Sequence, residues 1–140
     1  GGLTPEELTV FSYEDQGVAM LEDGLYTTEE KLQDPEMVDK LARFLSASVK
    51  GWKWAAENPE EAAEIVLEYD DTGAQTEDHQ IRMAKEVAKL LEGNPKEIGY
   101  LDPAAFDRTV DILLSGDSAP VITEKPEGAW THEVYEKSGL

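Results

Sequence analysis

Residues 8–30 read LTVFSYEDQGVAMLEDGLYTTEE and carry the clearest strand signal in this 140-residue chain. Apolar and polar side chains alternate over residues 8–13, a polar turn follows, and a short second run covers residues 25–27. Alternation with a period of two is typical of a strand that buries one face. We therefore predict a strand at each of these two runs, joined by a loop.

The loop between the two runs is acidic and is bounded by glycines. Gly17 and Gly24 allow the backbone to bend sharply, because glycine has no side chain that would clash. The four carboxylates of the loop belong to Glu14, Asp15, Glu22 and Asp23. Two interpretations stay open: a ligand-binding loop, or an ordinary acidic surface loop.

The rest of the chain has helical periodicity. From Pro35 onward, apolar residues recur every three or four positions, and the face they form comprises Met37, Leu41, Phe44, Leu45, Ser48, Trp52 and Ala55. Gly51 lies inside this helix, where glycine is unfavourable, so we expect a close packing neighbour there. Asn58-Pro59, Thr76 and Asp102-Pro103 are start signals for three further helices.

These signals predict a single domain or partial lobe over residues 1–140. Its parts are a strand–loop–strand segment over residues 8–30, a helical body over 35–115, and a C-terminal extended piece and short helix over 116–140. The extended piece covers residues 121–123 and the final helix covers residues 129–137. The predicted fold class is an α-dominant α/β fold with about five helices and one or two short strands.

The composition excludes several functions. Thirty-one acidic and 12 basic residues give a net charge of −19, which disfavours binding to nucleic acid or to an anionic membrane. The absence of cysteine removes disulfides, thiolate metal sites and thiol nucleophiles. No apolar run approaches the roughly 18 to 20 residues of a membrane-spanning helix.

Catalytic and metal chemistry have little support in the sequence. His79 and His132 are the only histidines, and neither has further ligands at metal-binding spacing. Carboxylate pairs are so abundant that no pair points to a glycosidase-like site. We therefore expect no catalytic residue, no metal and no cofactor, and keep a hydrolase that uses two of the acids only as a third alternative.

Trp52 and Trp54 lie about 200 degrees apart around a helix, so they cannot share a face. Trp52 belongs to the predicted buried face, and Trp54 should point to a boundary or to a ligand-facing surface. Core packing is the simpler interpretation of both, and an aromatic stacking platform is the alternative.

Three longer stretches resemble a known family. They are YEDQGVAMLEDGLY at residues 13–26, FLSASVKGWKWAAENPEEAA at 44–63, and PVITEKPEGAWTH at 120–132. In this order they resemble the C-terminal part of periplasmic substrate-binding proteins of ABC importers. Within that family they are most similar to the group related to thiamine-pyrimidine synthases, which includes nitrate, sulfonate and taurine binders.

The resemblance implies the C-terminal portion of a periplasmic-binding-protein-like (type II) fold, a two-lobed clamp whose ligand lies between the lobes. It implies that residues 8–30 cross between lobes and contribute to the cleft, and that the N-terminal half is absent from this chain. The ligand contacts it implies are Tyr13, Glu14, Asp15, Glu22 and Asp23, and we add Trp54 as a further candidate.

The implied function is non-enzymatic binding of a small pyrimidine-like, amine-bearing or sulfonate ligand. An acidic, aromatic loop favours pyrimidine-like or cationic ligands over anions. The implied partner is an ABC permease and the implied location is periplasmic or extracytoplasmic. Unpaired strand edges at residues 8–13 and 25–27 would favour a homodimer or a swapped oligomer. The alternative is an acidic helical protein–protein interaction module without a small-molecule ligand.

Overall fold

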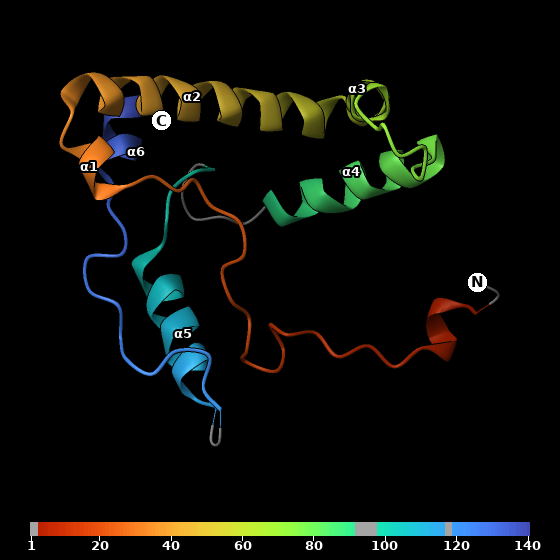
Figure 1. Cartoon of the computed structure of the whole chain (residues 1–140). Helices are drawn as coiled ribbons and strands as arrows, with labels where there is room; N and C mark the ends of the chain where they lie inside the picture. The colour runs from red at the N-terminus through yellow and green to blue at the C-terminus, as the bar shows by residue number, and fades with distance from the viewer. Residues whose placement is uncertain (1–2, 92–97, 117–118) are drawn as a thin grey trace. The chain divides into compact units, whose positions relative to one another are not determined.

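The computed structural model describes residues 3–91, 98–116 and 119–140 (Figure 1). The chain forms two compact units, one made of Gly1–Gly24 with Leu101–Trp130 and the other of Leu25–Tyr100 with Thr131–Leu140. Among the described residues, no helix has the length and apolar character needed to cross a membrane.

The unit Leu25–Tyr100 with Thr131–Leu140 is built on one long helix. Figure 1 shows α6 beside the N-terminal half of α2, while α3 continues from the end of α2 and α4 runs back beneath its C-terminal half. The helices are α1 (Glu29–Leu32), α2 (Pro35–Glu57), α3 (Pro59–Glu68), α4 (Glu77–Leu91) and α6 (Glu133–Ser138).

Local capping residues set the ends of these helices. The Asp34 side chain accepts a hydrogen bond of 2.9 Å from the backbone N–H of Glu36, and Pro35 opens α2. Asn58 ends α2 by donating from its side-chain Nδ2 to the Trp54 carbonyl at 2.8 Å, and Pro59 then opens α3. The predicted helix starts at Pro35 and at Asn58-Pro59 are thus confirmed, because these signals act locally. At α3 the start has Pro59 at the first position, and the Asn58 side chain makes no capping bond to the helix.

The buried face of α2 differs from the predicted one. It consists of Val38, Ala42, Leu45 and Val49. Leu45 belongs to the predicted face, and the other three residues lie beside it. Phe44 is 59% exposed and Trp52 is 50% exposed, so the prediction that they belong to the core is wrong. The reason is that the packing neighbours of α2 cover only part of its circumference, and periodicity alone does not identify which apolar arc they cover.

Gly51 has no close packing neighbour. A Cβ atom added there would meet nothing within 4 Å, so the expectation of a tight contact is wrong. The close approach occurs at Gly99 instead, where an added Cβ would lie 2.9 Å from Leu45 Cδ1. Gly99 also has a φ of +94°, a backbone conformation that favours glycine.

The unit Gly1–Gly24 with Leu101–Trp130 contains the short 3₁₀ helix η1 (Pro5–Glu7) and the helix α5 (Pro103–Leu114). The Asp102 side chain caps α5 by accepting from the Ala104 N–H at 3.2 Å. Val110 of α5 is buried. After α5 the chain turns back, and the Val121 N–H donates to the Leu113 carbonyl at 3.0 Å.

The α/β prediction is wrong. Within the described ranges the structure has helices and irregular segments but no strand, at residues 8–13, 25–27 or elsewhere. Among the described residues, no hydrogen bond engages the backbone of residues 8–11 or 25–27. Strand propensity depends on packing against neighbouring strands, and an isolated two-stranded pair is marginal in water. The alternating pattern therefore indicated strand propensity, but residues 8–13 and 25–27 do not form strands.

The C-terminal helix begins later than predicted. α6 starts at Glu133, and the Thr131 side-chain oxygen accepts from the Glu133 N–H at 3.1 Å. Trp130 therefore precedes the helix, and its ring packs edge-on against Phe106 of α5 with centroids 6.3 Å apart. The difference arises because Gly128, at φ +60°, ends the preceding turn. Residues 129–132 then separate Gly128 from the first residue of the helix.

Candidate functional site

Residues 13–17 form a tight turn at the start of the predicted ligand loop. The Val18 N–H donates to the Tyr13 carbonyl at 2.9 Å and the Gly17 N–H donates to the Glu14 carbonyl at 3.0 Å. Gly17 has a φ of +71°, which the turn requires. The turn therefore brings Tyr13, Glu14 and Asp15 together, and all three are exposed, Tyr13 by 72%.

The segment after the turn is held on helix α5. The backbone N–H of Leu21 donates to Thr109 Oγ1 at 2.9 Å, and Arg108 Nε donates to the Ala19 carbonyl at 3.2 Å. Thr109 in turn donates its hydroxyl proton to the Ala105 carbonyl at 2.9 Å, which fixes the orientation of the hydroxyl. Two adjacent residues of α5 thus position the acidic loop, which we define as residues 13–23.

Sequence reasoning did not select Arg108 or Thr109. Their partners lie 89 and 88 residues earlier in the chain, and no local pattern connects the two segments. One feature of the sequence could have pointed to them. Arg108 and Thr109 are polar residues within a helix that carries the apolar residues Phe106, Val110 and Leu113.

An open hollow of about 550 Å³ lies where the turn meets α5. Gly17 forms one side, and α5 contributes the charged side chains of Asp107, Arg108 and Asp111. One guanidinium group and two carboxylates in an exposed setting can engage a polar molecule that carries both donors and acceptors.

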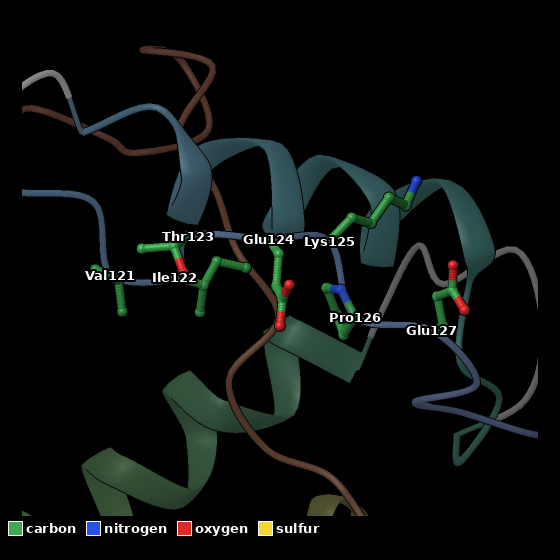
Figure 2. Close-up of a pocket in the computed structure, with 7 residues that line it drawn as sticks. All are labelled: Val121, Ile122, Thr123, Glu124, Lys125, Pro126 and Glu127. Carbon is green, nitrogen blue, oxygen red and sulfur yellow. The ribbon is translucent and has the colours of Figure 1, made fainter.

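Lys125 adds a cation beside the same helix. Its Nζ lies 2.9 Å from Asp107 Oδ1, and both side chains are more than half exposed. The hydrogen bond to Asp107, reinforced by the charges of Asp107 and Asp111, raises the pKa of Lys125. Figure 2 shows the Lys125 side chain extending along the helix while Glu124 points away from it. The surrounding hollow of about 660 Å³ is lined only by residues 121–127, so it is a surface concavity of one segment.

The other predicted contacts are also on the surface. Glu22 and Asp23 follow the tethered residue Leu21 and are exposed. Trp54 lies on α2, in the other compact unit, and is 42% exposed, which agrees with the predicted boundary position. The structure thus gathers Tyr13, Glu14 and Asp15 in one turn and places Glu22 and Asp23 further along the same loop.

Both histidines belong to the compact unit that does not contain the acidic loop. His79 is exposed on the first turn of α4. His132 stacks on Tyr100 with ring centroids 4.4 Å apart, and Tyr135 meets Tyr100 edge-on. Among the described residues no group of three or more His, Cys, Asp or Glu is arranged to hold a metal ion.

Comparison with known proteins gives one family match. Residues 3–62 match the family model described as NMT1/THI5 like. No curated protein and no solved structure matches the chain. The matched range includes the resembling stretch at residues 13–26 and nearly all of 44–63, whereas residues 120–132 lie outside it. Residues 3–62 are therefore similar to the NMT1/THI5-like family, which is consistent with the resemblance to substrate-binding proteins.

Proposed function

We propose that this chain is a solute-binding component of an ABC importer and acts without catalysis. The observation that carries the proposal is the family match over residues 3–62, because that range contains all six residues predicted to contact a ligand. The proposed site is the acidic loop. Trp54 belongs to the other compact unit and is kept as a separate candidate contact.

The anchoring of the acidic loop supports this role. A binding loop needs a fixed backbone, because ordering a mobile loop upon binding lowers affinity. The turn hydrogen bonds at residues 13–18 and the tethers from Arg108 and Thr109 supply that order before a ligand arrives. Exposed carboxylates on such a loop are available to hydrogen-bond donors.

The chemistry of the loop favours a pyrimidine-like or amine-bearing ligand. Carboxylates accept hydrogen bonds from amino groups, and the exposed Tyr13 ring offers a face for stacking or for a cation. A sulfonate or nitrate would meet Glu14, Asp15, Glu22 and Asp23, whose negative charges repel it.

Thermal-shift screening of the complete natural polypeptide tests the ligand class. We expect aminopyrimidines and small amines to raise the melting temperature in a saturable manner, and sulfonates such as taurine to have a smaller effect. A flat response to all three classes would contradict the proposal.

A second candidate, an acidic helical interaction module, is favoured by a specific observation. Several large apolar side chains on the helices are exposed, including Phe44 at 59%, Ile65 at 46% and Leu90 at 79%. Each of these side chains lies on a different helix of the same compact unit and is accessible to a protein partner. In this alternative the acids of the loop serve only solubility, so substituting Glu22 and Asp23 by their amides would leave partner binding unchanged.

The proposed setting follows from the same resemblance. We place the protein in the periplasm or another extracytoplasmic location, with an ABC permease as its partner. A homodimer or swapped oligomer through residues 8–13 and 25–27 is part of the proposal, because among the described residues the backbone groups of residues 8–11 and 25–27 make no hydrogen bond.

A further inference from the structure

We propose that a cavity bounded by α2, α3 and α4 binds a small neutral aromatic molecule that carries one hydrogen-bond donor. The cavity has a volume of about 240 Å³ and lies wholly within the unit that contains Leu25–Tyr100. It is separate from the acidic loop, so this inference does not depend on the proposed function.

The cavity exists because small residues face one another across the three helices. α2 and α4 diverge from the end where α3 joins them (Figure 1). The positions that face one another across this space carry alanines. These positions are Ala55 and Ala56 on α2, Ala62 and Ala63 on α3, and Ala84 and Ala88 on α4. Larger side chains line the rest of the wall, including Trp52, which is 50% exposed, and Met83, which is 46% exposed.

The volume and lining select the size and polarity of the ligand. An apolar cavity of about 150 Å³ in another protein stays dry and binds benzene, whereas drug-sized ligands occupy about 300–1,000 Å³. The present cavity falls between these sizes and is open to solvent on one side, so a one- or two-ring molecule fits with one edge exposed. Apart from Gln80, every residue lining it is apolar, so water gains few partners there and an aromatic ring gains contacts with Trp52 and Met83.

Gln80 supplies the single polar contact. Its Nε2 donates to Gln75 Oε1 at 2.6 Å, which fixes the orientation of the amide. Gln80 lines the cavity, and among the described residues its Oε1 makes no hydrogen bond, so this oxygen can accept one from a ligand. A ligand with one N–H or O–H donor therefore fits better than a pure hydrocarbon.

Charge excludes ionic ligands from this cavity. An anion would approach a protein of net charge −19, and any ion would lose its hydration among apolar side chains. The nearby cation of Lys85 is paired with Glu60 across α4 and α3 at 2.7 Å. A neutral molecule is the class that remains.

Calorimetric titration with indole tests the proposal, with 1-methylindole and indole-3-acetate as comparison probes. We expect saturable 1:1 binding of indole, about fivefold weaker binding of 1-methylindole because it lacks the donor, and no binding of the anion. At ten times the dissociation constant, indole should raise the melting temperature by about 4 °C.

Variants locate the binding. Ala84→Leu fills the cavity and should weaken indole binding at least about tenfold, while Ala47→Leu, the same change at an exposed position on α2, should have no effect. Gln80→Leu should abolish the preference for indole over 1-methylindole. Circular dichroism establishes whether each variant is folded. If Ala84→Leu is not folded, the Gln80→Leu variant decides whether the proposal holds.

Three results would overturn the proposal. The first is the absence of saturable indole binding. This includes the case in which the wild-type protein is a dimer that Ala84→Leu disrupts, because a second copy of the chain would then cover the cavity. The second is indole affinity that Ala84→Leu leaves unchanged in a folded variant. The third is a preference for indole that persists in Gln80→Leu.

Discussion

Two glycines near α2 have opposite surroundings, and substitution by alanine should have opposite effects. Gly51 lies inside α2 with open space around it, so Gly51→Ala should stabilise the protein by about 0.5–1 kcal/mol. Gly99 has a positive φ and touches Leu45, so Gly99→Ala should destabilise it by about 1–3 kcal/mol. Urea unfolding of both variants measures these changes, and destabilisation by Gly51→Ala would contradict the open environment.

Asp70 should make stability depend on pH. Hydrogen bonds from the Thr72 side chain and then from the Gln75 backbone N–H lower the pKa of Asp70 in the folded protein. A lowered folded-state pKa means that the stabilisation is present above the ordinary Asp pKa of about 3.9 and is lost as the pH falls through the folded-state value. We expect wild type to melt above Asp70→Asn at pH 7, with the difference shrinking toward pH 3.

The neighbouring exposed acid provides the control for this titration. Asp71→Asn removes the same charge without removing those hydrogen bonds, so its effect on melting should lack that pH dependence. A melting difference for Asp70→Asn that is constant from pH 7 to pH 3 would contradict the assignment.

At the level of elements, α5 holds the acidic loop through Thr109. Thr109→Val keeps the shape of the side chain but removes the acceptor for the Leu21 N–H. Losing this bond should speed hydrogen exchange at the Leu21 amide by about fivefold, because such a bond contributes about 1 kcal/mol. Thr109→Ser should retain protection, and the Val18 amide, bonded to Tyr13, is the internal reference. Equal exchange in both variants would show that Thr109 does not tether the loop.

Elements differed in how well the sequence predicted them. Helix starts at Asp34-Pro35 and Asp102-Pro103 depend on residues within one turn, and the sequence was sufficient. The strand at residues 8–13 depends on a partner elsewhere, so its alternating pattern misled. Trp52 had the spacing of a core residue but is half exposed, because burial depends on which neighbouring elements cover the side chain.

In the candidate site, too, features that depend on neighbouring residues were predictable and contacts between distant residues were not. The turn at residues 13–17 was predictable from Gly17 and the polar residues around it. The contacts from Arg108 and Thr109 were not, because they join segments nearly ninety residues apart. The positions of Glu22 and Asp23 after that tether likewise required the structure.

For the whole molecule, the unpaired backbone at residues 8–11 predicts self-association. Light scattering over a range of concentrations should show a dimer that forms as concentration rises. Val10→Pro removes a backbone N–H and disfavours strand pairing, so it should shift the protein to monomer. Val10→Thr, which keeps the backbone N–H and the β-branched shape, is the control and should leave the dimer in place. A wild-type monomer with rapidly exchanging amides at residues 8–11 would contradict dimerisation.

The central claim is that the acidic loop binds a pyrimidine-like or amine-bearing solute. The most direct measurement is calorimetric titration of the complete natural polypeptide with an aminopyrimidine, before and after Glu22→Gln with Asp23→Asn. Removing two ligand carboxylates should weaken binding at least about tenfold, whereas Glu64→Gln with Asp71→Asn, which removes equal charge elsewhere, should leave affinity unchanged. Equal affinity in the two double variants would contradict the claim.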